Sequence, residues 1–262
     1  MSLPLDDRGL LLGDGLFETM LWRDGTIAWL GDHLDRMAAG CAALGLPAPD
    51  RNEAADLCRA APGAAGIEAG RAAVRLSLTA GSGGRGLDRP AAPVPRLFAT
   101  AAPSAPVSTP AVAMVAKVRR NEGSPASRLK TLSYLDNVLA RAQARAAGAD
   151  EAVMVNNRGE LACAGAANLF WIADGRLFTP ALDCGVLAGI ARARVLALAA
   201  AWNVPAIEVA VGAQALRAAQ AVFLTNSLIG ARPVSRLDGR TLASHPLVER
   251  LGQALDDVTG CG

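Results

Sequence analysis

The chain has 262 residues, of which 52% are hydrophobic and 19% are charged, and its formal net charge is +2. This length suffices for one large domain or two lobes with a sizeable core. The small net charge and the absence of a basic block argue against a nucleic-acid partner. The sequence has no apolar run long enough to cross a membrane, and its start lacks the pattern of a signal peptide. We therefore expect a cytoplasmic protein.

The opening part of the sequence predicts a small N-terminal α/β lobe over residues 1–102. Two apolar runs flank Asp24-Gly25, which favours a hairpin. The next segment has apolar residues at helical spacing, and Asp32 is its expected N-cap. Three further elements are expected in this lobe: a helix over 52–61, a strand over 72–81 and a strand over 96–102.

Residues 103–110, PSAPVSTP, are rich in proline and serine and predict a linker. Beyond them the sequence predicts a larger C-terminal lobe over residues 111–262. Its expected elements follow in chain order: a strand over 111–118, a helix over 130–147, short strands within 151–180, a helix over 189–202, strands near 207–211 and 221–226, and a helix over about 245–257.

The cysteine pattern gives no sign of a metal site. Five cysteines occur without a CxxC pair, and the sequence has only two histidines, His33 and His245. An odd number of unpaired cysteines is typical of reduced, buried thiols. We therefore expect neither a structural disulfide nor a bound metal.

The basic residues are distributed unusually. Of the 26 basic residues only Lys117 and Lys130 are lysines, and the other 24 are arginines. An amine can lose its proton and form an imine with an aldehyde, whereas a guanidinium stays charged. A lysine retained against this bias is therefore a candidate for chemistry. On the count alone, chance retention of a solvated lysine is an equal alternative.

Seven segments follow one another along the chain: GDGLFET (13–19), HLDR (33–36), VRLSLTAGSGGRG (74–86), KTLSYLDNVLARAQA (130–144), GADEAVMVNNRGELACAGAANLFW (148–171), TPALDCGVLAGIAR (179–192) and FLTNSLIGARPV (223–234). In this order they resemble the fold-type IV pyridoxal-phosphate (PLP) enzymes. This family includes branched-chain and D-amino-acid aminotransferases and 4-amino-4-deoxychorismate lyase. The resemblance implies an α+β fold of two lobes, the larger with a mixed, barrel-like sheet. It also implies PLP as cofactor, a small-molecule amino substrate and a homodimer.

The resemblance assigns the reactive end of the cofactor to two residues. Lys130 matches the lysine that forms a Schiff base with PLP and then moves protons, in agreement with the lysine count. A lysine with this role must be partly neutral. Tyr134 matches a tyrosine that bonds the cofactor's phenolic oxygen. The alternative for Tyr134 is an ordinary half-buried tyrosine.

The resemblance also assigns a phosphate site. Arg36 matches the family's phosphate arginine, and a guanidinium fork suits a phosphate well. Gly189, Ile190 and Ala191 open a helix whose free amides and positive dipole end favour an anion. Ala191 replaces a common threonine, so one hydroxyl donor is missing, and Ser227 matches a further hydroxyl donor. The alternative for Arg36 is a solvated helix residue.

The main departure from the family lies at Cys163. An ungapped alignment between Gly159 and Asn168 places Cys163 where the family has a glutamate that keeps the pyridine nitrogen protonated. Glu160 does not replace it, because residues three apart in a strand point to opposite faces. A neutral thiol makes the cofactor a weaker electron sink, whereas a thiolate would restore the pairing.

These residues are compatible with two enzymatic functions, a lyase and a transaminase, and with a non-catalytic PLP-binding protein. Phe17 and Arg75 match positions on the substrate side, although a strand arginine is as often structural. The wording GAANLFW and LTNSL favours aminodeoxychorismate lyase, in which formation of an aromatic ring could offset a poor electron sink. The runner-up is a transaminase of branched-chain or D-amino acids. A non-catalytic PLP-binding protein is the third alternative, and retention of Lys130, Arg36, Tyr134 and Ser227 argues against it.

Overall fold

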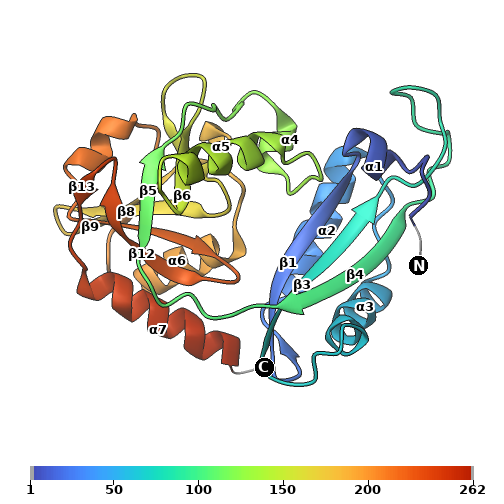
Figure 1. Cartoon of the computed structure of the whole chain (residues 1–262), viewed down its shortest axis with the longest axis horizontal. Coiled ribbons are helices and arrows are strands. Elements are labelled where there is room, and N and C mark those ends of the chain that lie inside the picture. Colours follow the sequence, from blue (N-terminus) through green and yellow to red (C-terminus); the bar gives the residue numbers. More distant parts are fainter. Residues whose placement is uncertain (1–2, 261–262) are drawn as a thin grey trace. The chain divides into compact units, whose positions relative to one another are not determined.

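The structure, a computed structural model, describes residues 3–260, with side chains up to Asp257. It divides into two compact units (Figure 1). The first unit contains the chain up to Ala105 and the short segment Leu129–Ser133. The second contains Pro106–Arg128 and Tyr134–Val258. The division after Ala105 falls inside the expected linker, but Leu129–Ser133 groups with the first unit although the sequence placed it in the larger lobe.

The first unit is a four-stranded antiparallel sheet with two helices on one face. The strand order is β2-β1-β3-β4. Alternate residues of the strands, such as Leu16, Met20 and Leu76, pack with α2 and α3 in one apolar cluster. Period-two alternation therefore gives this sheet one helix-covered face. The element bounds are α1 Arg8–Leu12, β1 Gly15–Arg23, β2 Thr26–Ile27, α2 Leu30–Leu44, α3 Arg51–Ala64, β3 Arg71–Thr79 and β4 Arg96–Pro103.

Two local predictions for this unit need correction. The N-cap of α2 is Trp29, in the left-handed region at φ 55°, and Asp32 lies in the first turn instead. The short helix α1, which the sequence analysis did not predict, is capped by the Asp7 carboxylate, which accepts from the Gly9 N–H. Asp32 still favours the helix, because an acidic residue in the first turn interacts well with the helix dipole.

The segment around Lys130 is a turn that pairs with β1, and it is not helical: Lys130 lies in the turn, and the next residue, Thr131, forms an isolated bridge with Leu16. The Phe17 N–H donates to the Lys130 carbonyl at 2.8 Å, and the Leu132 N–H donates to the Gly15 carbonyl at 3.0 Å. The predicted helix over 130–147 is therefore wrong at its start, and α5 spans Leu135–Ala146. The reason is tertiary: pairing with β1 satisfies backbone groups that a helix would otherwise have used.

The second unit is built on one mixed sheet of nine strands. Its order is β10-β9-β8-β11-β12-β5-β6-β7, with β13 beside β12. Parallel pairs join β9 with β10, β12 with β5 and β5 with β6, and the other pairs are antiparallel. The bounds are β5 Ala111–Val115, α4 Pro125–Arg128, β6 Glu151–Val155, β7 Leu161–Ala164, β8 Asn168–Ala173, β9 Arg176–Pro180, α6 Ile190–Ala201, β10 Ala206–Val209, β11 Ala221–Asn226, β12 Gly230–Leu237, β13 Arg240–Thr241 and α7 Pro246–Gly260.

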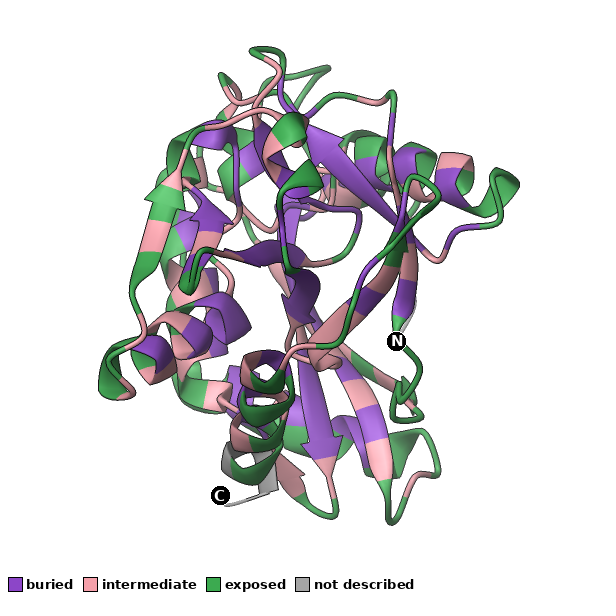
Figure 2. Ribbon diagram, turned by 90° about the vertical axis from the view of Figure 1, so that its left-hand side faces the viewer, coloured by how far each residue is buried: buried purple, intermediate pink, exposed green. Residues whose placement is uncertain are grey.

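This sheet curls around its own core. The Leu161 N–H in the edge strand β7 donates to the carbonyl of Val211, just beyond the opposite edge strand β10, at 2.8 Å. One apolar cluster contains residues of β5, β6, β7, β8, β11 and β12, including Val153, Trp171 and Val222. The strands β6, β7, β8 and β11 are almost entirely buried, whereas helices carry buried and exposed stripes (Figure 2). The α+β class with a barrel-like core in the larger lobe is confirmed. Within the described residues, no helix is long and apolar enough to span a membrane.

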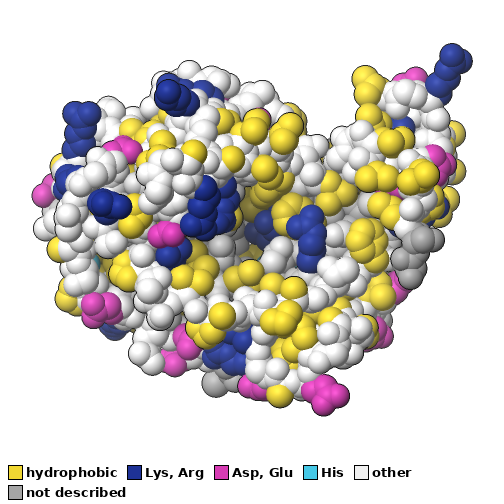
Figure 3. Space-filling model, in the orientation of Figure 1, with side chains coloured by type: hydrophobic (Ala, Val, Ile, Leu, Met, Phe, Trp, Pro, Cys, Tyr) yellow, Lys and Arg dark blue, Asp and Glu magenta, His cyan; other side chains and the backbone are white. Residues whose placement is uncertain are grey.

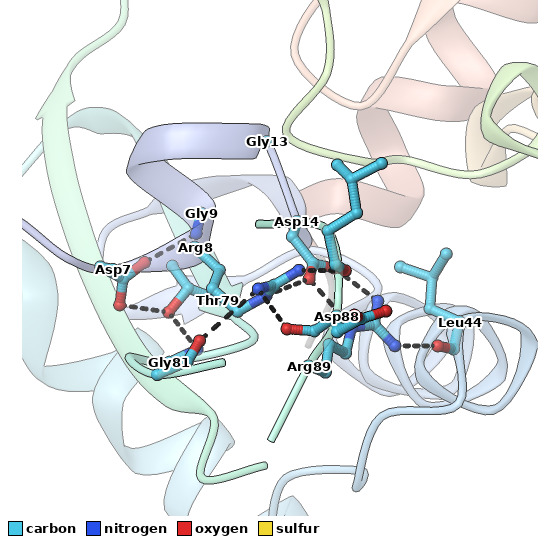
Figure 4. A network of polar contacts seen from close by, with 12 residues as sticks. Asp7, Arg8, Gly9, Gly13, Asp14, Leu44, Thr79, Gly81, Asp88 and Arg89 are labelled. Carbon is cyan, nitrogen blue, oxygen red and sulfur yellow. Dashed lines mark hydrogen bonds and ion pairs between the residues drawn. The ribbon is translucent and has the colours of Figure 1, made fainter. Parts of the chain in front are cut away.

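A polar network in the first unit holds down the glycine-rich segment after β3 (Figure 4). The buried Arg8 guanidinium donates to the Leu87 carbonyl at 2.8 Å and to the Asp88 carbonyl at 3.0 Å. Its Nε donates to Asp14 at 2.9 Å, and Asp14 also binds Arg89. The hydrogen bond from Arg89, with help from Arg8, holds the pKa of Asp14 below its usual range despite partial burial. Segment 81–90 is thus fixed by charge-assisted hydrogen bonds.

Replacement of Arg8 by methionine tests this role. We expect Arg8→Met to lower the free energy of unfolding by about 1–3 kcal/mol, because Asp14 and the carbonyls of segment 81–90 lose a charged donor. Limited proteolysis should then cut segment 81–90 faster. Arg51→Met is the control, since its ion pair with Asp35 is exposed and should contribute under about 1 kcal/mol. Equal effects of the two substitutions would contradict the assigned role.

Candidate active site

Lys130 lies on the sheet face opposite α2 and α3. Its Nζ is 4.2 Å from the centroid of the Phe17 ring, and the Arg75 Cζ is 3.7 Å from the same centroid. Phe17 and Arg75 point to this face because β1 and β3 pair Phe17 with Ser77 and Thr19 with Arg75. The structure thus brings together three of the predicted site residues. Both cations contact an aromatic face that attracts positive charge.

Arg36 lies on the helix-covered face of the same sheet. Its Nε donates to Glu18 Oε1 at 2.8 Å, and its Nη2 donates to Glu18 Oε2. His33, one helical turn earlier in α2, lies 2.7 Å from Glu18 Oε2 through Nδ1. Arg36 is therefore not a solvated helix residue, since its side chain is 19% exposed and forms a forked ion pair. Sequence reasoning gave no role to Glu18 or His33, although both lie in the quoted segments GDGLFET and HLDR.

The protonation states of this cluster follow from burial and partners. Burial alone would raise the pKa of Glu18, but hydrogen bonds from Arg36 and His33 outweigh it and lower that pKa. Burial lowers the pKa of His33, although the bond to Glu18 opposes this. We therefore assign an ionised Glu18 and a neutral His33 whose Nδ1–H donates to the carboxylate.

In the second unit, three segments that carry other predicted residues are attached to the turn between β7 and β8. The Asn137 amide donates to the Gly165 carbonyl at 2.8 Å, and the Asn226 amide donates to the Ala166 carbonyl at 2.9 Å. Asn168, which ends this turn, donates to the Leu187 carbonyl at 3.0 Å. Three asparagines therefore attach the start of α5, the turn after β11 and the segment before α6 to one turn. Tyr134, Ser227 and Gly189–Ala191 lie on these three attached segments.

The start of α6 can bind an anion. Gly189 is its N-cap and has no side chain to cap it, so the first amides have no intrahelical acceptor. Gly189 is also required sterically, since a Cβ there would lie 1.9 Å from Asn168 Oδ1. Ile190 and Ala191 are buried, and Ala191 indeed offers only its backbone. The Ser227 turn is rigid, because Asn226 Oδ1 accepts from the amides of Leu228 and Ile229.

Cys163 lies in an apolar environment. It pairs with Met154 across β6 and β7 and packs in a cluster with Ala140 and Ala152 under α5. Burial raises the pKa of its thiol above the ordinary value. The thiolate that would restore the pairing with a pyridinium is therefore disfavoured. Glu160 is held elsewhere, since its carboxylate accepts from Asn156 at 2.7 Å and from Arg158 at 2.9 Å.

Arg120 is a buried arginine that no sequence motif singled out. Its Nη1 donates to Asn137 Oδ1 at 2.9 Å, its Nε donates to the Gly185 carbonyl at 3.1 Å, and its Nη2 donates to the Ser127 carbonyl. These acceptors are neutral, so no negative charge compensates the guanidinium at these bonds. Its positive charge favours a thiolate at Cys163 and so opposes part of the rise in the thiol pKa that burial causes. Lone arginines give no recognisable signal in a sequence that has 24 of them.

The remaining candidates for chemistry in the described part of the chain are few. Lys117 is exposed, whereas Lys130 is half-buried. No group of His, Cys, Asp and Glu side chains among the described residues could hold a metal ion. The described cysteines, 41, 58, 163 and 184, are free and buried, and Cys261 lies outside the described residues.

A family model and similar proteins all relate this chain to the class IV aminotransferases. The family model described as amino-transferase class IV matches residues 15–237. A protein of Methanocaldococcus jannaschii, provisionally named a branched-chain-amino-acid aminotransferase, is 32% identical over 90% of this chain and 83% of its own length. The D-alanine aminotransferase of Listeria monocytogenes is 29% identical over 100% of this chain and 93% of its own length.

A solved structure from Legionella pneumophila, provisionally named a 4-amino-4-deoxychorismate lyase, has the same fold. Its TM-score is 0.91 at 28% identity, and the match covers 98% of this chain and 96% of that one. Proteins similar to this chain therefore carry aminotransferase and lyase names alike. At these identities the specific reaction is not decided by similarity.

Gly189→Ala tests the close packing at the start of α6. We expect this variant to lower the free energy of unfolding by about 1–3 kcal/mol, because Asn168 must move and lose its bond to Leu187. Gly63→Ala in α3 is the matched control, since a Cβ there meets open space. The control should change stability by less than about 1 kcal/mol and in the favourable direction. A neutral Gly189→Ala variant, measured by urea unfolding, would overturn the steric argument.

The buried His33 predicts a dependence of stability on pH. Its pKa is lowered in the native state, so below the ordinary histidine pKa of about 6.5 the unfolded chain binds more protons. Stability is therefore lost as the pH falls below that value, by at most about 1.4 kcal/mol per pH unit. His33→Asn keeps a donor near the Nδ1 position and does not titrate. Urea unfolding at pH 7.5, 6.5 and 5.5 should show a shallower loss for this variant, and identical pH slopes would contradict the assignment.

Proposed function

Because the chain belongs to the amino-transferase class IV family, we propose that it binds PLP through Lys130 and converts 4-amino-4-deoxychorismate to 4-aminobenzoate and pyruvate. The observation that carries the cofactor assignment is the placement of Lys130. Its backbone is bonded to β1, and its amine lies against Phe17. Of the two lysines, it is the one withdrawn from full exposure, as an amine that must become neutral requires.

The donor set of the described residues fits PLP. Arg36 offers a guanidinium, the first amides of α6 offer backbone donors, and Ser227 offers a hydroxyl, all of which suit a phosphate. Tyr134 offers a hydroxyl for the ring oxygen, and Cys163 would lie at the ring nitrogen. These roles are carried over from the family position by position. The attachment of three of these segments to the β7–β8 turn supports them, because a binding site needs a rigid frame.

Lys130 would perform the proton transfers. When bound, PLP withdraws electrons from the α-carbon of the amino substrate. The Nζ of Lys130 would take the proton from that carbon and return a proton during the loss of pyruvate. Phe17 would exclude water beside the amine, and Arg75, fixed on the same ring, would bind a substrate carboxylate.

Cys163 favours the lyase over the transaminase. A buried thiol with a raised pKa supplies no negative charge to a ring nitrogen, and the nearby Arg120 adds positive charge. Both weaken the cofactor as an electron sink. Formation of an aromatic product supplies a driving force that transamination lacks, so the lyase reaction tolerates such a site better. The protein would then act in folate synthesis.

The second candidate is a transaminase of branched-chain or D-amino acids. It is favoured by the similarity to a branched-chain-amino-acid aminotransferase at 32% identity and to a D-alanine aminotransferase at 29% identity. The residues that hold PLP would be the same in this case. The difference would lie in the substrate side, where Phe17 and Arg75 would accept a different amino acid.

We further propose a cytoplasmic homodimer. Along α5, the side chains of Leu135, Val138 and Leu139 are 68%, 59% and 47% exposed at helical spacing, so they form one apolar stripe. Hydrophobic side chains reach the surface at many points of the face shown in Figure 3. A second copy of this chain would bury such side chains.

Substrate turnover distinguishes the two reactions. We expect the PLP-loaded protein to release pyruvate from 4-amino-4-deoxychorismate without any keto acid, and Lys130→Ala to abolish this release. Leucine or D-alanine should leave the visible absorbance band of the lysine-bound cofactor in place. Bleaching of the band by either amino acid, together with no release of pyruvate, would replace the lyase by the transaminase.

Cys163→Glu tests the electron-sink argument. A glutamate at this position should shift the cofactor absorbance and raise any transamination of D-alanine or leucine by about tenfold or more. Its burial should also lower the stability of the cofactor-free protein. Cys163→Ser is the control, because it keeps a small neutral group. If the spectrum and the rates of Cys163→Glu equal those of the control, Cys163 does not face the ring.

A further inference from the structure

The Glu18 carboxylate is buried at considerable cost. Its side chain is 1% exposed and that of His33 is 0% exposed, whereas that of Arg36 is 19% exposed. Removal of a carboxylate from water costs several kcal/mol, and a buried ion pair is weak evidence for a gain in stability. The cluster therefore calls for an explanation other than stability.

The geometry around Glu18 fixes a guanidinium plane. Arg36 uses its Nε and Nη2 donors on the two oxygens of one carboxylate, which is the forked arrangement with the strongest orientational preference. Glu18 thus occupies the Nε–Nη2 edge of the guanidinium. An anion that binds Arg36 in the same plane meets the Nη1–Nη2 edge.

His33 fixes the carboxylate in turn. It donates from Nδ1 to the same Oε2 atom that accepts from Arg36, and it lies three residues before Arg36 on α2. A neutral imidazole adds a hydrogen bond without adding a charge. The cluster therefore keeps Arg36 in one orientation. Its net charge is zero, because the charges of Arg36 and Glu18 cancel and His33 is neutral.

Strand β1 connects this cluster to Lys130. Phe17 and Glu18 are neighbours in the strand, so their side chains point to opposite faces of the sheet. Phe17 contacts Lys130 on one face, and Glu18 binds Arg36 on the other. The position of the guanidinium is thus tied to the same strand whose backbone, at Gly15 and Phe17, holds the lysine segment.

We propose that Glu18 and His33 are positioning residues that orient the Arg36 guanidinium for the phosphate of the cofactor. They touch neither phosphate nor substrate and act through Arg36. This inference rests on the proposed function, because it takes Arg36 as a phosphate ligand. Loss of such an outer partner typically weakens ligand binding about 10-fold to 100-fold in metal sites, and we expect a similar scale here.

The test compares PLP with pyridoxal, which lacks the phosphate. The dissociation constants of both are measured by absorbance titration of the full-length, cofactor-free protein. The dissociation constant of pyridoxal divided by that of PLP, here called the ratio, reports how much the phosphate contributes to binding. Glu18→Gln should lower this ratio by about tenfold, and His33→Leu should lower it several-fold. His33→Asn, which retains a donor, should remain near the wild type. Asp56→Asn, at an exposed pair with Arg59 on α3, is the neutral control.

The outcomes separate this inference from the proposed function. If Arg36→Gln leaves the ratio unchanged, the phosphate role of Arg36 fails and the inference fails with it. If Arg36→Gln lowers the ratio but Glu18→Gln and His33→Leu do not, the inference alone is overturned. Equal weakening of PLP and pyridoxal would show a merely structural role and would also overturn it. Should Glu18→Gln fail to fold, Glu18→Asp replaces it, since its shorter carboxylate cannot reach both donors.

Discussion

The constraint on which the candidate site depends is the pairing of the Lys130 segment with strand β1. The Phe17 N–H and the Lys130 carbonyl are hydrogen-bonded, so the lysine is attached to a strand and does not lie on a free loop. Alternation along the strand then presents Phe17 to Lys130 and Glu18 to Arg36. Two consecutive residues therefore set the surroundings of the amine and the orientation of the arginine. Rigid secondary structure gives more accurate placement than a loop would.

In the second unit, side-chain amides hold the segments that carry candidate site residues in place. Asn137 and Asn226 donate to backbone carbonyls in the β7–β8 turn, and Asn168 donates from the end of that turn to the Leu187 carbonyl before α6. These bonds hold together segments that are far apart in sequence. The buried Arg120 adds three further hydrogen bonds, which it donates to the backbone carbonyls of Gly185 and Ser127 and to the side-chain oxygen of Asn137. The start of α6 has no side-chain cap in this frame, and backbone amides without a cap are what an anion site at a helix start needs.

Much of this fold follows from sequence patterns, and the exceptions have physical causes. Alternating and apolar runs predict the strands, and the lysine count together with the motifs singles out Lys130. The helix over 130–147 starts too early, because edge pairing with β1 outweighs local helix propensity. Glu18 and His33 went unassigned because their partners are distant in sequence. Arg120 went unassigned because two of its three acceptors are backbone carbonyls, which leave no pattern in a sequence, and the third is the distant Asn137. The environment of Cys163 likewise required the packing under α5, since burial decides the pKa of its thiol.

The central claim is that Lys130 holds the cofactor, and the chain has only one other lysine, Lys117, to compete with it. Reduction of the PLP-loaded protein with borohydride, followed by digestion and mass spectrometry of the peptides, tests this directly. We expect a pyridoxyl group on the peptide that contains Lys130 and an unmodified Lys117. A label on Lys117 alone, or no label on either lysine, would contradict it.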